Sequence, residues 1–458
     1  MYLLGKNILK NFIFIFFILV SSSFAQTLDT KKESSNFVFL NENNPAGTAE
    51  DKVRERIENF AKTHNINFGI PQGNRFFTYG IYSFSIDKEG YERRKVVAFE
   101  KAYMDAMKEM AKTISTKITT ETIRELKSVT PEEDFGNVSN LEVLKRKMLV
   151  LTDATLNKLL EKLGVSPEKI GKLSLEQKRN LFLDKLEKKI VTETLANLRG
   201  TLVYKTFEEI DKDGNCAVGV ILFNSKKLQN LADAFAKNQI PPYRNPNKAK
   251  PIEAYLPKTK KEWLEAWGVQ VIWDNKGYPA LISYGQWGYP LVGPKYVLRR
   301  KDMIAERQAN SLAEAYITQF INMDVLAREI SRTGMEEKEN EVLDINMKRI
   351  EDIDKIIEDF YEKTKTLSKA HIVGLTTLKR KRICYKIGNY PACTYIVVKL
   401  LSPQNVIKVN NYLNSKKETQ KFQENKSDKN KEVKKKINTS PYIEESLEGP
   451  SNVDISDW

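Results

Sequence analysis

Two distant segments of the chain follow the same pattern in the same register. Cys216 is followed by a run of apolar strand formers and then by Ser225, and Cys393 is followed by a similar run and then by Ser402. In both segments the serine comes nine positions after the cysteine, where its hydroxyl can cap the first turn of a following helix. A strand, a capping serine and a helix repeated at equal spacing indicate a duplicated structural unit.

A long helical pattern precedes each of these two segments. Over residues 93–128 and again over 301–332, apolar side chains recur at steps of three and four, which places them on one face of a helix. Each helix also carries three alanines spaced four positions apart. The two alanine strips are Ala98, Ala102 and Ala106, and Ala305, Ala309 and Ala313. We expect a sheet or a second helix to pack closely against each strip.

Runs of β-branched and aromatic residues between turn residues predict the strands. Strands are expected at 76–86, 201–210, 217–223, 269–273, 280–284, 372–378 and 394–401, and further helices at 50–63, 141–163, 175–198, 226–237 and 336–366. The chain is thus predicted to be an α+β protein made of two similar helix-on-antiparallel-sheet units, residues 51–240 and 265–415. The proline-rich segment 241–264 predicts a stiff linker between them.

The first 25 residues are typical of a cleavable export signal. Lys6 and Lys10 form a basic start, residues 12–20 form an apolar run, and small residues up to Ala25 place the cut before Gln26. An uncleaved anchor is the alternative, but a spanning helix needs about 20 apolar residues, and this run ends after nine. No cysteine stands near the cut, so no lipid anchor is expected. We therefore predict a periplasmic or secreted mature chain.

Two further segments are predicted to lack a packed core. Residues 26–50 are rich in Ser, Asn, Thr and Lys and predict a flexible leader. Residues 416–458 begin with a lysine-rich stretch and end with an acidic one, which predicts a disordered tail. The last residues of this tail could serve as a docking peptide, although a solvated tail is the favoured interpretation.

The chain is strongly basic, with a formal net charge of +14. In a cytoplasmic protein this excess would suggest nucleic acid, but export removes that partner, so we predict no nucleic-acid binding. The lysines are scattered among nearly as many carboxylates, which favours a solvated mixed-charge surface. Attraction to anionic envelope polymers or lipid headgroups is the alternative. No later stretch is long and apolar enough to span a membrane, so no transmembrane segment is expected after signal cleavage.

Three cysteines are too few for a disulfide scaffold, but export allows one bond. Cys384 and Cys393 flank a segment of turn residues, and a bond between them would close a hairpin loop; spacing alone does not decide whether it forms. Cys216 would then be a buried apolar residue or a free thiol. The two histidines, His64 and His371, provide no zinc-site spacing. We predict no catalytic residue, no metal site and no cofactor.

Aromatic residues gather in one stretch, residues 263–290, which holds four of the five tryptophans. Glycines on both sides of Trp287 suggest a loop that another molecule can approach closely. Exposed rings of this kind stack on sugars or anchor protein interfaces, whereas buried rings fill a core, and we favour the core. The candidate partner or glycan surface consists of Trp273, Tyr284, Trp287 and Tyr289.

The helical segment 97–106, together with the later strand–serine–helix ending, resembles the helix-on-sheet units of exported bacterial proteins. That group includes flagellar-assembly families, small outer-membrane lipoproteins and large proteins of unknown function. The resemblance implies an envelope role and carries over no catalytic residue, and the missing lipidated cysteine departs from the lipoprotein members. We therefore predict a non-enzymatic envelope protein that binds or scaffolds partners. The alternative is a glycan- or peptidoglycan-binding or processing protein that uses the aromatic segment.

Overall fold

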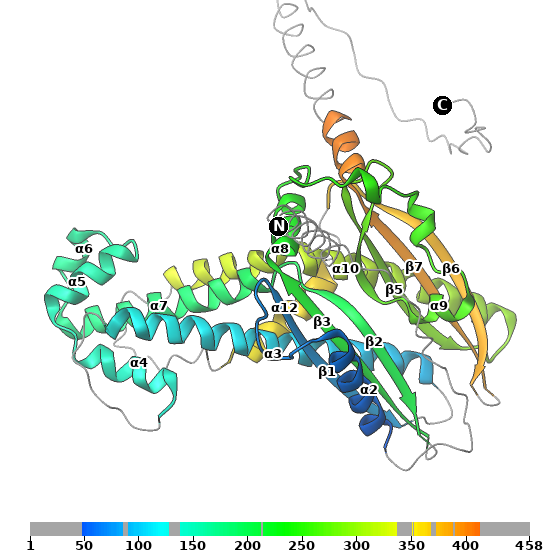
Figure 1. Ribbon diagram of the computed structural model, residues 1–458, viewed down its shortest axis with the longest axis horizontal. Coiled ribbons are helices and arrows are strands. Elements are labelled where there is room, and N and C mark those ends of the chain that lie inside the picture. Colours follow the sequence, from blue (N-terminus) through cyan, green and yellow to red (C-terminus); the bar gives the residue numbers. More distant parts are fainter. Residues whose placement is uncertain are drawn as a thin grey trace, which may run out of the picture. The chain divides into compact units, whose positions relative to one another are not determined.

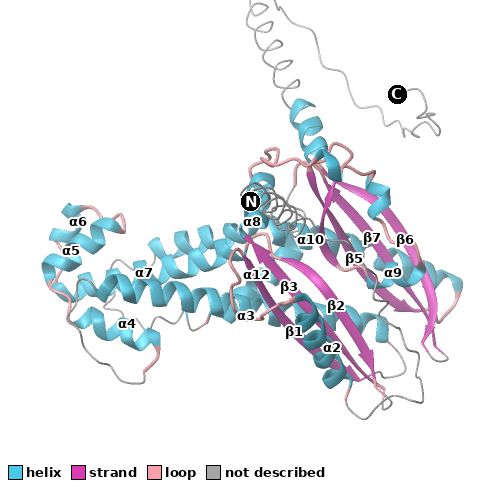
Figure 2. Ribbon diagram, viewed as in Figure 1, coloured by secondary structure: helices cyan, strands magenta, loops and turns pink. Residues whose placement is uncertain are grey.

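The computed structural model describes residues 48–85, 90–127, 138–211, 214–336, 350, 352–367, 372–387 and 390–412. The predicted export signal, nearly all of the predicted leader, the predicted tail and His371 lie outside these residues. Contacts between the described residues from Thr48 to Val406 group them into one compact unit. Figures 1 and 2 show its helices and strands.

The first repeat runs from a strand through long helices to a hairpin and a short helix. Helix α2 (Ala49–His64) precedes it and starts with a capping box in which Thr48 and Asp51 bond each other's backbone. The elements of the repeat are β1 (Arg75–Ser85), α3 (Tyr91–Lys127), α4 (Asn140–Leu149), α5 (Asp153–Lys162), α6 (Pro167–Gly171), α7 (Leu175–Leu198), β2 (Leu202–Ile210), β3 (Asn215–Ser225) and α8 (Lys226–Ala236). The single helix expected at 141–163 is two helices, because Thr152 caps a new one.

The second repeat has the same order of elements after a connecting segment. The connecting segment contains η1 (Pro246–Lys248), η2 (Ile252–Tyr255) and α9 (Lys260–Glu265). The second repeat follows with β4 (Gly268–Trp273), β5 (Pro279–Pro290), α10 (Lys295–Glu336), α12 (Ile353–Leu367), β6 (Leu375–Ile387) and β7 (Tyr390–Leu401). A further helix begins after Ser402. Strand β5 continues six residues beyond the expected 280–284, and α10 starts six residues before the expected Lys301.

The two sheets have one topology. The first has the order β1-β3-β2 and the second the order β4-β5-β7-β6, and neighbouring strands pair antiparallel in both. Strand β5 corresponds to β1, β7 to β3 and β6 to β2, so β4 is an extra edge strand in the second sheet. The predicted α+β fold with an internal duplication is confirmed.

A glycine in the first strand of each repeat receives the alanine strip of the long helix. An added Cβ at Gly80 would lie 2.1 Å from the carbonyl oxygen of Ala102, and one at Gly285 would lie 2.0 Å from that of Ala309. Only a residue without a side chain allows a helix backbone this close to a strand. The alanine strips therefore pack on sheets, each at a matching strand glycine.

Smaller details also recur between the repeats. The strand after the helices carries an irregularity near its start, between Val203 and Lys205 in β2 and between Thr377 and Lys379 in β6. The capping serines behave alike as well. Ser225 accepts a hydrogen bond from the backbone N–H of Leu228 at 3.3 Å, and Ser402 accepts one from Asn405 at 3.2 Å. The segment from Cys216 to Ser225 and the segment from Cys393 to Ser402 therefore occupy equivalent positions in the two repeats.

One hydrophobic core joins the two repeats. It contains Phe99 of α3 and Val220 of β3 together with Leu281 of β5 and Phe320 of α10. The outer face of the first sheet packs against α2, and the outer face of the second packs against the segment from η2 to α9. The segment 241–264 is therefore a covering layer as well as a connection, and the predicted units 51–240 and 265–415 share a core.

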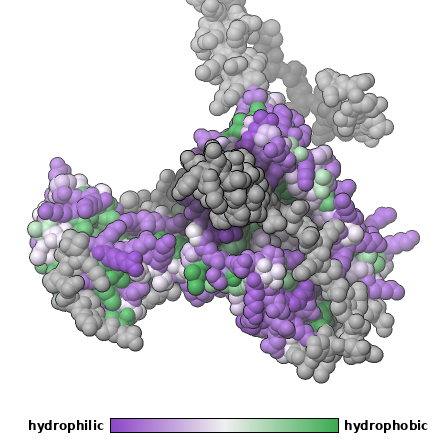
Figure 3. All heavy atoms as spheres, viewed as in Figure 1, coloured by the Kyte–Doolittle hydropathy of each residue, from purple (hydrophilic) through white to green (hydrophobic). Residues whose placement is uncertain are grey.

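A separate hydrophobic cluster lies among the helices of the first repeat. It joins the ends of α3 and α7 to α4, α5 and α6. On the face drawn in Figure 3 the surface is mostly hydrophilic, with small hydrophobic patches over these helices. No helix within the described residues combines the length and the apolar composition needed to cross a membrane.

Candidate functional site

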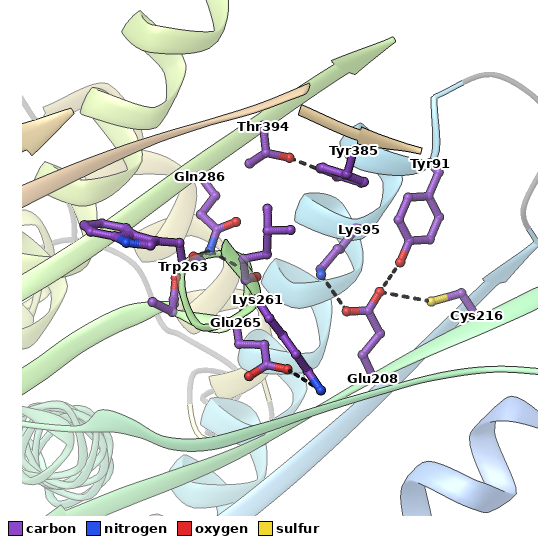
Figure 4. A network of polar contacts seen from close by, with 12 residues as sticks. Tyr91, Lys95, Glu208, Cys216, Lys261, Trp263, Glu265, Gln286, Tyr385 and Thr394 are labelled. Atoms are coloured by element: carbon purple, nitrogen blue, oxygen red, sulfur yellow. Dashed lines mark hydrogen bonds and ion pairs between the residues drawn. The ribbon is translucent and has the colours of Figure 1, made fainter. Parts of the chain in front are cut away.

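A buried polar cluster lies where the first turn of α3 meets the strands β2 and β3 (Figure 4). Glu208 is its centre: it accepts a hydrogen bond from the Tyr91 hydroxyl and pairs with the Lys95 ammonium, whose Nζ is 2.5 Å from Oε2. The Cys216 thiol lies 3.9 Å from the other carboxylate oxygen. Tyr91, Lys95 and Cys216 are all buried. The carboxylate is thus held by partners from α3 and β3.

Burial shifts the pKa values of two groups in this cluster. Burial raises the pKa of the Tyr91 hydroxyl well above its usual range, and the neighbouring Glu208 carboxylate adds to the effect. Burial also raises the pKa of the Cys216 thiol well above its usual range. A thiol acts as a nucleophile in its thiolate form, and Cys216 is a buried free thiol, which combines the two roles expected for it.

The outer face of the second sheet completes the joint. An added Cβ at Gly288 would lie 2.1 Å from the Cβ of Glu92, so the first turn of α3 touches strand β5. Burial raises the pKa of the Glu92 carboxyl. Beside it, the Tyr385 hydroxyl and the Thr394 hydroxyl are 3.0 Å apart. This cluster is therefore a polar seam between the repeats.

Gln286 ties the connecting segment to the same sheet. Its side-chain amide donates hydrogen bonds to the backbone carbonyls of Trp263, Leu264 and Ala266 at 3.2, 3.3 and 2.5 Å. These carbonyls belong to the end of α9 and the turn after it, where a helix leaves carbonyl groups without intrahelical partners. The glutamine thus fixes the end of α9 against β5.

The aromatic stretch 263–290 is mostly strand and core. The residues expected in a loop around Trp287 belong to β5, a central strand paired with β4 and β7. Tyr284 and Tyr289 are buried, and Trp287 is half-buried with the Arg93 guanidinium 5.8 Å from its ring centre. The glycines expected to admit a ligand admit the chain's own helices, so the loop expectation is corrected.

Trp273 lies apart from the other predicted surface residues. It ends β4 and is half-buried, with the ammonium groups of Lys227 and Lys248 5.9 and 5.8 Å from its ring centre. Its ring is already in contact with cations of this chain. The four aromatic residues proposed as one surface therefore do not form a single exposed platform.

The two cysteines expected to pair lie directly opposite each other on β6 and β7. Cys384 and Cys393 are register partners and are joined by a disulfide. Cys393 is fully buried beside Tyr289 and Ala305. The disulfide therefore links the two strands on the face that α10 covers.

A row of ion pairs fastens α10 to the second sheet. Acidic residues spaced along the helix meet basic residues on β6 and β7. The pairs are Asp302 with Arg382 at 3.0 Å, Glu306 with Arg380 at 2.9 Å and Glu314 with Lys399 at 2.7 Å. The Tyr289 hydroxyl bonds Asp302, and burial raises the pKa of Tyr289 to about 12. The acids of the first turns of α10 thus point at the sheet.

The first turns of α10, together with Val292 just before them, carry an exposed surface that is both basic and apolar. Its apolar members are Val292, Tyr296, Met303 and Ile304, which are 50%, 75%, 56% and 45% exposed. Its basic members are Lys295, Arg299, Arg300 and Arg307, and no ion pair involves them within the described part of the chain. We call these eight residues the basic–apolar face. It was missed from the sequence because the helix was expected to start only at Lys301.

Within the described residues, no group of three or more His, Cys, Asp or Glu side chains is placed to hold a metal ion. Two features of the described residues remain for comparison. One is the buried seam around Glu208, which joins the repeats. The other is the basic–apolar face, which is accessible and is the candidate functional site.

Comparisons with known proteins give two similarities. Residues 141–237 match the model of a domain of unknown function (DUF6844), which covers α4 to α8 of the first repeat. The chain is also similar to the hypothetical protein FTT1539c from Francisella tularensis, whose crystal structure aligns with a TM-score of 0.47 and 21% identity over 80% of this chain and 94% of that chain. The comparison with curated proteins found no match. Neither similarity is to a flagellar-assembly or lipoprotein family, so that resemblance stays a prediction.

Proposed function

We propose that this chain is exported and works in the cell envelope as a non-enzymatic protein that binds a partner through the basic–apolar face. The proposal combines the predicted signal with the surface chemistry of α10. The glycan alternative is not pursued, because Tyr284 and Tyr289 are buried and Trp287 is half-buried.

The observation that carries the proposal of export is the disulfide between Cys384 and Cys393. Disulfides persist in oxidising compartments such as the periplasm and the extracellular space, and they are rare in the cytosol. The N-terminal signal and the paired cysteines are independent features of the sequence, and both favour the same compartment.

The observation that favours binding over catalysis is that Glu208 and Lys95 inside the fold are paired with each other, whereas basic groups are exposed at the start of α10. Glu208 is occupied by Tyr91 and Lys95, and Asp302 and Glu306 of α10 are occupied with the sheet. Four exposed bases, Lys295, Arg299, Arg300 and Arg307, lie close together at the start of α10 next to exposed apolar side chains. Such a cluster is suited to hold a surface or another molecule.

Cell fractionation tests this function. The full chain is produced in a Gram-negative host, and the osmotic-shock, membrane and cytoplasmic fractions are probed with an antibody beside a cytoplasmic marker. We expect the shortened chain in the shock or membrane fraction, and in the membrane fraction the amount should fall after a high-salt wash. A full-length chain that stays with the cytoplasmic marker would contradict the proposal.

A further inference from the structure

We infer that the partner of the basic–apolar face is an anionic lipid surface, on which the first turns of α10 lie flat. The inference rests on the proposed function, since the surface in question is a membrane of the envelope. No described helix could cross that membrane, and the contact would be peripheral.

The geometry of α10 places five of the eight members of the face in one sector of the helix, whereas Lys295 and Arg299 lie nearer the row of acids and Val292 precedes the helix. Arg300, Met303, Ile304 and Arg307 come four, seven, eight and eleven positions after Tyr296. In a helix with about 3.6 residues per turn, these spacings place all five side chains on the same side. The opposite sector is the alanine strip, which is fully buried against the sheet. The exposed apolar side chains are therefore not part of the core packing of α10.

The helix is held rigidly behind this face. The Lys301 ammonium donates hydrogen bonds to the carbonyls of Pro290 and Val292 at 3.3 and 3.0 Å, which fixes the loop before the helix. Asp302 and Glu306 pair with the sheet. The arginines of the sheet thus neutralise these two carboxylates, and the charged groups that face the solvent on this part of the helix are basic.

The mixture of side chains favours lipid over the other partners. A protein interface also uses Tyr, Met and Arg, but it gathers its apolar side chains into a core that is poor in charge, whereas here four bases are interleaved with four separate apolar side chains. Sugar recognition requires exposed ring faces, and Tyr296 is the single aromatic ring of the face. Bases beside aromatic and aliphatic side chains on an exposed helix side are the composition that lies at a headgroup boundary.

Lipid vesicles test the inference with the purified mature chain. Co-sedimentation is measured with vesicles of phosphatidylcholine alone and with vesicles that also contain phosphatidylglycerol, since each base near an anionic surface strengthens binding about fivefold. We expect binding to the anionic vesicles, little binding to phosphatidylcholine and loss of binding at high salt. Equal binding to both vesicles, or none to either, would overturn the inference.

Variants locate the contact. The double variant Arg300→Glu, Arg307→Glu should weaken binding by about 30-fold or more, since two attractive charges are removed and two repulsive ones added. The double variant Tyr296→Ser, Met303→Ser should weaken it while retaining its salt dependence. The control Lys162→Glu, Lys172→Glu makes the same change of net charge at exposed positions on α5 and after α6.

The control decides between a docking face and a general charge effect. If the control variant weakens binding as much as the arginine variant, the inference is wrong. Circular dichroism and the urea midpoint of each variant establish that it is folded. The result is separable from the function proposed above: an exported chain that ignores anionic vesicles overturns the lipid partner alone, and a chain retained in the cytoplasm overturns export whatever the vesicles show.

Discussion

Substitution of Gly285 by alanine should destabilise the chain through a contact that no side-chain rotation can relieve. The new Cβ would lie 2.0 Å from the carbonyl oxygen of Ala309 and 2.5 Å from the backbone nitrogen of Ala313. A close carbon–oxygen contact is about 3.3 Å, so α10 must move away from β5 by about 1.3 Å. A gap of this order forfeits about half of the dispersion attraction across the helix–sheet contact.

Overpacking of a well-packed core costs about 1–3 kcal/mol, and a clash between two backbones should lie at the upper end of that range. We expect a loss of about 3 kcal/mol in the free energy of unfolding. With a urea dependence of about 3 kcal/mol per molar, the midpoint of unfolding should fall by about 1 M, measured by tryptophan fluorescence.

Two comparisons make this prediction specific. Gly80→Ala, the equivalent change in the first repeat, should lower the same transition by a similar amount, because its Cβ would lie 2.1 Å from the carbonyl oxygen of Ala102. Gly171→Ala adds a Cβ that meets nothing within 4 Å, and it should leave the midpoint unchanged or raise it slightly. A Gly285→Ala variant as stable as Gly171→Ala would refute the reasoning.

Three further outcomes follow from the described contacts. Glu208→Ala should lower the free energy of unfolding by about 3 kcal/mol because it removes one member of a buried ion pair, whereas Glu193→Ala at an exposed helix pair should cost less than about 0.5 kcal/mol. Equal losses in urea unfolding would contradict a structural role for the seam. Replacing Cys384 and Cys393 together by serine should cost about 2.7 kcal/mol from loop closure, and an unchanged urea midpoint would contradict a bond in the folded chain. A hydrogen bond from Lys237 holds the pKa of Asp233 below its usual 3.8. The stabilisation of the folded chain by this ion pair is therefore complete above pH 3.8 and is lost as the pH falls through the folded-state pKa. Asp233→Asn should differ in stability from the parent at about pH 6 and not at about pH 2, and a difference that persists in acid would exclude this ion pair as its cause.

The duplicated fold could be predicted because its signals are local in the sequence. The alanine strips and the cysteine-to-serine register each lie within one element, and each repeats at matching spacing. The glycines that receive the strips were not identified. Their role depends on which strand lies against which helix, and Gly80 and Ala102 belong to different elements that meet only in the folded chain.

The aromatic segment shows how a correct observation led to a wrong structure. The glycines on both sides of Trp287 do permit close approach, as expected, but the groups that approach are Glu92 of α3 near Gly288 and the alanine strip of α10 at Gly285. A glycine indicates that something comes near, and the sequence does not reveal whether it is a ligand or another part of the same chain.

The seam around Glu208 and the basic–apolar face differ in how clearly the sequence indicates them. The seam joins Lys95 to Glu208 across more than a hundred residues, so no local spacing could have indicated it. The basic–apolar face did leave a signal, since Tyr296, Arg300, Met303 and Arg307 recur at helical steps. That signal was lost because the helix was expected to start at Lys301, after its first turns.

The proposal that the chain is exported is tested most directly by the intact mass of the chain recovered from producing cells after denaturation in a thiol-alkylating reagent. The account predicts a chain that begins at Gln26 and carries one alkyl group, on Cys216, because Cys384 and Cys393 are bonded. A chain that retains Met1 and carries three alkyl groups would contradict it.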